Sequence, residues 1–243
     1  AMNRTIVATA LGATAFAGAA LAWRRSRQQE LLQRIESSNV IPIITPVIEI
    51  PTAEYVLSRM EHMPLDDVTL VLHTEGGCVT SCVMIADALR KFTRSTAIVP
   101  YMAISGGTLI ALNAKRLVMG RNAVLSAVDP QIFGQRARHI PERDEDGLHP
   151  LAQEYDSAVS QYLRTTLTDR LRDHPDPKAL DRAMSVFMGE NAPHAWPIKA
   201  TDLARLGLPV ETASRQWAGL VDEYRLAIDP RTGLALRGGR CRR

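Results

Sequence analysis

Two glycine pairs and one serine are the residues of this chain whose types and spacing point most directly to chemistry. The pair Gly76-Gly77 follows an apolar run at residues 68–73, and Ser105 stands directly before Gly106-Gly107. A glycine pair lets backbone N–H groups approach a substrate, as an oxyanion hole requires. A serine at a helix start meets the positive end of the helix dipole, where a nucleophile is useful. Taken alone, each signal also fits a structural role, a tight turn for the glycines and an N-cap for the serine.

The elements that must position these residues alternate between strands and helices. Short apolar runs predict buried strands at residues 68–73, 97–101, 117–119 and 124–127. Helical spacing predicts helices at residues 52–63, 79–91, 151–172, 178–189 and 201–206, with another starting at Thr108. Residues 40–50 read as an edge or irregular strand, because two prolines interrupt them, and the charged segment 134–150 reads as a surface loop. The alternation is typical of a parallel sheet covered by helices, and such sheets build their sites where strands end.

From about Val68 to Val210, the motifs follow one another in the order of a known superfold. They are HTEGG at 73–77, the serine segment at 105–112, VMG at 118–120, DPQ at 129–131 and HAWPI at 194–198. In these segments the chain resembles the Clp-protease/crotonase superfold, and most closely the serine dehydrogenase proteinase family, related to signal peptide peptidase A. The resemblance implies an α/β fold, a repeated ββα superhelix with a mostly parallel sheet, and assembly into a homo-oligomer.

The same resemblance implies the roles of the residues in the two glycine turns. Ser105 would be the nucleophile of a serine peptidase that acts on peptide or protein substrates. The N–H groups of Gly77 (or Gly76) and Gly106 would form the oxyanion hole. A triad of Ser105, His194 and Asp129 is chemically sound, since the roles depend on geometry rather than on chain order.

The sequence leaves the general base open. The family's motif around His194 usually carries threonine and aspartate where this chain has Pro193 and Ala195. Relatives of signal peptide peptidase A use a lysine, and Lys199 is the alternative base here. Arginines occupy the loop where such a lysine is expected, among them Arg136, and arginine cannot act as a base near neutral pH. Two other functions therefore stay open: a catalytically degenerate binding scaffold and, less well matched, acyl-CoA chemistry of the crotonase type.

The overall charge comes from the two ends of the chain. The 243 residues include 29 basic and 26 acidic ones, and residues 1–27 with 230–243 hold nine basic residues and no acidic one. The body at 28–229 therefore has a net charge of −6, which does not favour a nucleic-acid partner. With 46% hydrophobic residues the chain can bury a core, which excludes a disordered or fibrous protein. We expect a basic tail at 230–243 and the peptidase domain at 28–229.

The N-terminal segment predicts a membrane anchor. Residues 5–23 carry no charge, although eight of the nineteen are alanine, and about 20 apolar residues cross a bilayer. Arginines at 24, 25 and 27 outnumber Arg4 before the run, which places the catalytic domain on the cytoplasmic side. We expect a single-pass anchor over residues 1–27; a cleaved signal peptide or a soluble alanine-rich helix are the alternatives.

No cofactor is expected for this chain. The pair Cys78 and Cys82 supplies only two ligands of a zinc site, and no further motif completes the set. The two cysteines are four apart on one helix face, and both are predicted to be small core residues. The sequence contains no GxxxxGK[ST] phosphate loop, so we expect catalysis without ATP hydrolysis by this chain.

Overall fold

The computed structural model describes residues 26, 29–31, 33–35, 38–143, 146–190 and 192–228. The chain divides into two compact units, Asn39–Ala218 and a second unit of Ala1–Ser38 with Gly219–Arg243. In the described part of the second unit, Arg34 and Glu223 form an ion pair of 2.7 Å beside a small apolar cluster. The predicted anchor at 5–23 and tail at 230–243 lie outside the described residues. Within the residues that are described, no helix has the length and apolarity needed to cross a bilayer.

A five-stranded parallel sheet forms the centre of the larger unit. Its order is β1 (Val40–Ile44), β2 (Asp67–His73), β3 (Arg94–Val99), β5 (Arg116–Met119) and β10 (Glu211–Thr212). Each neighbouring pair is parallel, with β1 at one edge as its prolines predict. Strands β2 and β3 are buried over most of their length, which explains their continuous apolar sequences. The predicted α/β class with a mainly parallel sheet is confirmed.

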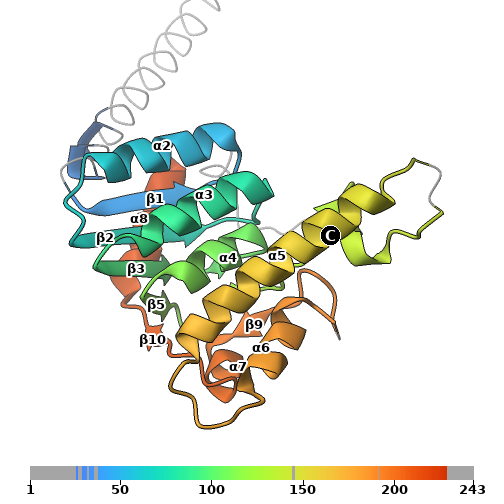
Figure 1. Cartoon of the computed structure of the whole chain (residues 1–243). Helices are drawn as coiled ribbons and strands as arrows, with labels where there is room; N and C mark the ends of the chain where they lie inside the picture. Colours follow the sequence, from blue (N-terminus) through green and yellow to red (C-terminus); the bar gives the residue numbers. More distant parts are fainter. Residues whose placement is uncertain are drawn as a thin grey trace, which may run out of the picture. The chain divides into compact units, whose positions relative to one another are not determined.

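Helices α2 (Ile50–Glu61), α3 (Val79–Arg90), α4 (Gly106–Asn113) and α5 (His149–Arg170) pack in this order against one another, and lie along the sheet in Figure 1. Helix α4 is buried at every residue from Gly107 to Asn113. Its sequence is correspondingly apolar on all sides. Further helices follow α5 in the chain, namely α6 (Ala179–Phe187), α7 (Ala200–Arg205) and α8 (Arg215–Ile228), and α8 was not predicted from the sequence.

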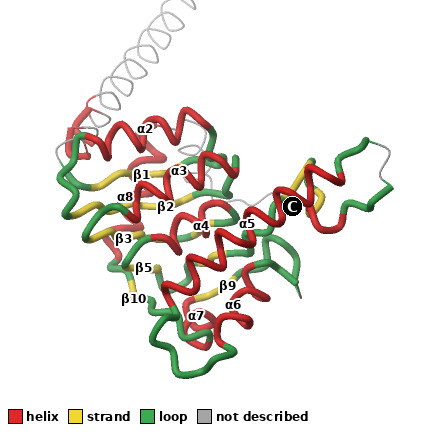
Figure 2. The backbone as a smooth tube through the Cα atoms, in the orientation of Figure 1, coloured by secondary structure: helices red, strands yellow, loops and turns green. Residues whose placement is uncertain are grey.

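A second, three-stranded sheet links distant parts of the chain. It consists of β4 (Met102–Ala103), β6 (Val124–Leu125) and β9 (Ile198–Lys199). Strand β6 pairs with β4 in parallel and with β9 antiparallel. The pairing therefore gathers the residues that follow β4, follow β6 and precede β9, the last of which is labelled in Figure 2. These are the segments that contain Ser105, Asp129 and His194.

The prediction of a surface loop at 134–150 was wrong for the first part of this segment. There β7 (Gln131–Ile132) and β8 (Gln135–Arg136) form a hairpin, followed by the 3₁₀ turn η1 (Ala137–His139). Ala137 and Ile140 are buried in a small cluster with Ala152 of α5. The segment looked like a solvated loop because it is highly charged, but the Arg136 side chain is only 15% exposed.

The two cysteines at the start of α3 have opposite environments. Cys82 is buried as predicted, and its burial raises the pKa of the thiol to about 12. Cys78 is exposed at the N-cap, so the prediction of a core residue was wrong for it. Hydrogen bonds at the helix start lower the pKa of the Cys78 thiol, and the one from the Ser81 backbone has the largest effect.

We expect iodoacetamide at pH 8 to alkylate Cys78 in the folded protein about tenfold faster than Cys82, because the thiolate is the reacting form. Peptide mapping by mass spectrometry gives the two rates and separates them from the reaction of Cys241. In a denaturant the difference should disappear, which serves as the control. Equal rates in the folded protein would contradict the burial of Cys82.

Candidate active site

Two backbone turns pack against each other at the ends of β2 and β4. Thr74 and Ala103 form a parallel bridge, and the Ile104 N–H donates to the Thr74 carbonyl at 3.0 Å. Gly76 has a φ of +104°, and a Cβ there would lie 2.8 Å from the Ile104 carbonyl oxygen and 2.8 Å from Ser105 Cβ. A side chain at position 76 would therefore push the two turns apart.

The segment that follows β1 holds the first turn from its other side. The Ile48 N–H donates to the Gly76 carbonyl at 2.6 Å, and the Cys78 N–H donates to the Ile48 carbonyl at 2.8 Å. The Gly76 N–H donates to Thr74 Oγ1 at 3.1 Å, so this amide already has an acceptor. The Gly77 N–H finds no acceptor within the described part of the chain. Of the two candidate amides of this turn, that of Gly77 is the one available to a ligand.

Ser105 has a backbone conformation that few non-glycine residues adopt. Its φ is 54° and its ψ is −119°, at the junction between β4 and α4. Its side chain makes no capping hydrogen bond with α4, although Ser105 occupies the N-cap position. The structural role considered for this serine, an ordinary N-cap, is therefore absent from the structure.

Buried hydroxyl groups hold the backbone of Ser105 in place. The Ser105 N–H donates to Ser126 Oγ at 2.8 Å, and Ser126 Oγ donates to the Ala127 carbonyl at 2.9 Å. The Ser126 N–H donates to Thr108 Oγ1 at 3.0 Å, which in turn donates to the Ala103 carbonyl at 2.7 Å. Both hydroxyl side chains are fully buried, and networks of this kind rigidify a site. The sequence contains no motif that marks Ser126 or Thr108 for this role.

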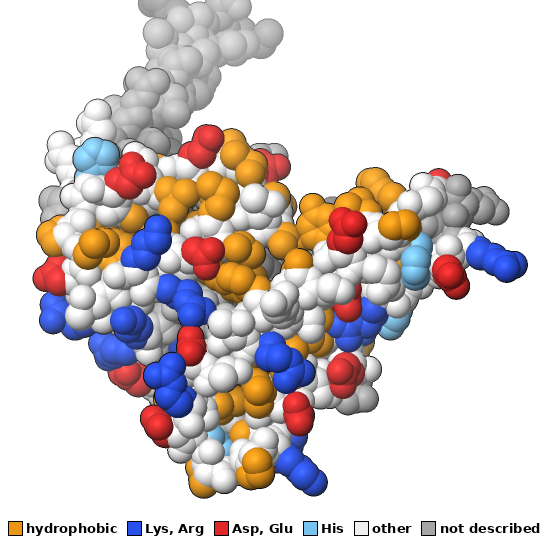
Figure 3. Space-filling model, in the orientation of Figure 1, with side chains coloured by type: hydrophobic (Ala, Val, Ile, Leu, Met, Phe, Trp, Pro, Cys, Tyr) orange, Lys and Arg blue, Asp and Glu red, His pale blue; other side chains and the backbone are white. Residues whose placement is uncertain are grey.

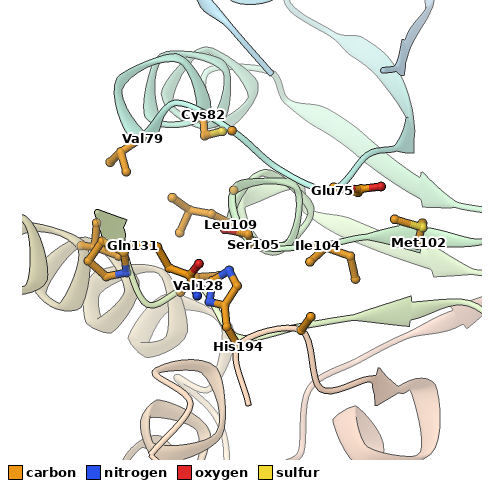
Figure 4. A pocket seen from close by; sticks show the side chains of 15 residues that line it. Glu75, Val79, Cys82, Met102, Ile104, Ser105, Leu109, Val128, Gln131 and His194 are labelled. Carbon is orange, nitrogen blue, oxygen red and sulfur yellow. The ribbon is translucent and has the colours of Figure 1, made fainter. Parts of the chain in front are cut away.

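A cavity of about 500 Å³ opens beside Ser105. Gly77, Gly106 and His194 line it together with Ser105, and Figure 4 shows His194 reaching from its turn toward the serine. Like that of Gly77, the Gly106 N–H has no acceptor among the described residues. A Cβ on Gly106 would lie 3.7 Å from the Gly77 nitrogen, so the two glycines are close neighbours in space. Residues that line one cavity thus supply two free amides and a hydroxyl, the groups that acyl transfer requires.

His194 and Asp129 are paired beneath this cavity. His194 Nδ1 lies 2.9 Å from Asp129 Oδ1, and the Asp129 side chain is only 1% exposed. A carboxylate accepts hydrogen bonds, so Nδ1 carries the proton and Nε2 is left as an acceptor. No hydrogen bond joins His194 to the Ser105 hydroxyl among the described residues, and such contacts are often loose until a substrate binds.

Arg136 is a site residue that the sequence did not reveal as one. Its Nε lies 3.0 Å from Asp129 Oδ2, as an ion pair rather than a directed hydrogen bond. Its other nitrogens donate to the carbonyls of Gly189 (2.7 Å) and Ala192, in the turn before His194. The guanidinium therefore compensates the buried charge of Asp129 and holds the segment that carries the histidine.

Gly189 ends α6 and makes the approach of Arg136 possible. It has a φ of +64°, and the hydrogen bonds from Gly189 to Val186 (3.1 Å) and from Glu190 to Ser185 (3.1 Å) form a Schellman motif. A Cβ at position 189 would lie 2.9 Å from the Arg136 guanidinium and 3.0 Å from Asp129 Oδ1. The helix end is thus packed directly against the ion pair.

Lys199, the alternative base, does not line the cavity. It is exposed at the N-cap of α7, where its backbone N–H donates to Asp202 at 3.0 Å. No group of three or more His, Cys, Asp or Glu that could hold a metal ion occurs among the residues described. The structure therefore brings Ser105, His194, Asp129, Gly77 and Gly106 together and leaves Lys199 outside.

Replacing Arg136 by glutamine should lower the free energy of unfolding by about 3–5 kcal/mol, because it leaves the Asp129 carboxylate buried without its counter-charge. Urea denaturation at fixed protein concentration measures the change. Adding Asp129→Asn should recover part of the loss, since no buried charge then remains. Arg116→Gln is the matched control, because Arg116 pairs with Glu211 at 2.7 Å on the surface. Equal midpoints for Arg116→Gln and Arg136→Gln would contradict a buried pair.

Known proteins resemble this chain in sequence and in fold. Two proteins of Methanocaldococcus jannaschii, the uncharacterized proteins MJ0137 and MJ1495, are 31% and 32% identical to it. The alignments cover 78% of this chain and 70% and 68% of theirs. Among solved structures, ClpP1 from Listeria monocytogenes matches with a TM-score of 0.54 and 15% identity, over 78% of this chain and 99% of ClpP1. That likeness shows the fold.

The family model for ClpP-like SDH-type serine proteinases matches residues 21–232, which is most of the chain. The match includes the two glycine turns, Asp129 and the His194 turn. It confirms the resemblance seen in the sequence motifs, and the alignments with the two relatives from Methanocaldococcus jannaschii also cover most of the chain. The chain therefore belongs to the ClpP-like SDH-type serine proteinase family.

Proposed function

We propose that this chain is a serine peptidase that cleaves peptide bonds through an acyl-enzyme on Ser105. The observation that carries the proposal is the cavity in which Ser105, His194 and the two glycine amides meet. Membership of a serine proteinase family agrees with this chemistry. The strained backbone at Ser105 supports a catalytic role, because such strain is concentrated at functional sites.

In the proposed acylation step, His194 Nε2 takes the proton of the Ser105 hydroxyl while Oγ attacks the carbonyl carbon of the substrate. The carbonyl oxygen becomes an oxyanion that accepts hydrogen bonds from the N–H groups of Gly77 and Gly106. The protonated His194 then gives its proton to the leaving amine, and the C–N bond breaks. Asp129 holds the imidazole in the correct tautomer throughout.

Deacylation repeats the same steps with water in place of the serine. His194 takes a proton from the water, whose oxygen attacks the ester carbon, and the same two amides stabilise the oxyanion. Return of the proton to Ser105 Oγ releases the carboxylic acid and restores the site. Arg136 acts as a positioning residue, because it contacts Asp129 and the turn before His194 rather than the substrate. The steps use groups of this chain and water, in line with a peptidase that does not itself hydrolyse ATP.

Replacing Ser105 by alanine should lower kcat for peptide hydrolysis about 10⁴-fold or more, and His194→Ala should cause a similar loss, because the two residues act as one unit. A fluorophosphonate label should modify Ser105 in the unaltered protein and fail to modify Ser105→Ala. The exposed Ser157→Ala on α5 serves as the control and should keep full labelling.

Failure of the folded, unaltered protein to react with the label would overturn the peptidase proposal. That result would favour the second candidate, a binding scaffold that has lost catalysis, whose motivation is the unusual Pro193 and Ala195 beside His194. Full activity of His194→Ala would instead overturn the role of His194 as the base while leaving Ser105 as the nucleophile.

We further propose that the peptidase is anchored to a membrane and assembles from several copies. The anchor rests on the uncharged residues 5–23 and the arginines after them. Assembly is supported by exposed apolar side chains on the helices, seen as orange areas in Figure 3. Exposed apolar side chains of the helices include Tyr55 on α2, Met84 on α3 and Leu151 on α5. Patches of this kind mark contact surfaces between proteins.

The full chain should remain in the membrane fraction after carbonate extraction, whereas a variant that lacks residues 1–27 should be released. Light scattering of the shortened variant should give a mass of more than one copy, and Met84→Glu should reduce that mass because it places a charge in an apolar contact. Release of the full chain by carbonate would overturn the anchor, and a monomeric mass would overturn the assembly.

A further inference from the structure

The cavity beside Ser105 has two chemically different sides. Figure 4 shows Val79 and Leu109 on one side of the serine and Glu75 with Ile104 on the other. The first side is mainly apolar, since Val128 also lies there, and Gln131 is its polar member. The second side contains a carboxylate. A substrate that crosses Ser105 therefore meets an apolar surface on one side of its reacting bond and a negative charge on the other.

Glu75 supplies the only carboxylate of the cavity lining, and none of the described lining residues is a lysine or an arginine. Glu75 is exposed, and its side chain forms no hydrogen bond or ion pair within the described residues. Its backbone is held in place, because its N–H donates to the Pro46 carbonyl at 3.1 Å. The backbone of Glu75 thus has a fixed place in the turn, two residues before Gly77 with its free amide, and its carboxylate is unpaired among the described residues.

A free carboxylate close to an oxyanion hole opposes the proposed reaction. In the transition state, negative charge develops on the substrate oxygen that the amides of Gly77 and Gly106 bind. A neighbouring negative charge raises the free energy of that transition state. Water screens this repulsion only in part. A positively charged group of the substrate that pairs with Glu75 would remove the repulsion and add an attraction of its own. Glu75 therefore favours cationic substrates over neutral and acidic ones.

We propose that Glu75 is a specificity-determining residue that selects peptides with a lysine or arginine side chain on its side of Ser105, with an apolar side chain on the other. This inference rests on the proposed peptidase function and names the substrate class of the same site. The same cation chemistry could come from the free α-amino group of a peptide end. The test separates the two sources by using peptides with free and with acetylated N-termini.

The experiment compares internally quenched peptides that differ at one position by Lys, Gln or Glu, with the position moved stepwise along both sides of an apolar residue. At one position, the unaltered protein should prefer Lys over Gln by about fivefold in kcat/KM, as expected for one solvated ion pair. Glu75→Gln should abolish this preference, and Glu75→Lys should reverse it in favour of Glu. High salt should weaken the preference, because the pair is accessible to water.

Matched controls separate the role of Glu75 from damage to the site. Glu154→Gln removes an exposed carboxylate on α5 that does not line the cavity and should keep the preference for Lys. Labelling of Ser105 by an uncharged fluorophosphonate shows for each variant that the site is assembled. The preference should persist with acetylated peptides, since it arises from a side chain.

Equal Lys-to-Gln ratios in the unaltered protein and in Glu75→Gln would overturn the inference, and so would a preference that vanishes on acetylation. In both cases the proposed peptidase function would stand, because hydrolysis and labelling of Ser105 are measured in the same samples. Absence of both labelling and hydrolysis would overturn the proposed function itself, and the inference with it.

Discussion

The close contact between two backbone turns is the constraint on which the site depends. The turn after β2 lies against the turn after β4, and the missing side chain of Gly76 lets the Ile104 carbonyl and Ser105 approach. This contact brings the free amide of Gly77 beside that of Gly106 and leaves Ser105 at the wall of a cavity. Strands β2 and β4 belong to different sheets, and the parallel bridge between Thr74 and Ala103 joins the two sheets at this point.

A buried charge forms the second half of the site. Asp129 pairs with both His194 and Arg136. The three residues come from three segments, which the β4–β6–β9 sheet and the β7–β8 hairpin bring together. A buried carboxylate is tolerable only when charge and hydrogen bonds compensate it. Arg136 supplies the charge and at the same time binds the carbonyls of the turn before His194. The Arg136 side chain thus both compensates the charge of Asp129 and holds the turn that carries His194.

Much of the fold was predictable, because local sequence patterns indicate its strands and helices. The buried strands β2 and β3 show as apolar runs, α3 shows as helical spacing, and the edge position of β1 follows from its prolines. Arg136 was missed because a charged segment resembles a solvated loop until the partner of the charge is known. Ser126 was missed for a similar reason, because a serine after a strand does not reveal which backbone N–H donates a hydrogen bond to its hydroxyl. Cys78 and Cys82 share one helix, yet only their tertiary surroundings make one exposed and the other buried.

By itself, the sequence determined the α/β class, the two glycine turns and the identity of Ser105 as the residue to examine. These are properties of short segments, in which spacing and residue type already limit the backbone. Only the tertiary structure decided which amide of the first turn is free, that His194 rather than Lys199 reaches the cavity, and that Arg136 belongs to the site. Each of these depends on contacts between segments far apart in the chain. Hydrogen bonding and charge compensation are properties of such contacts, and no local pattern of residues contains them.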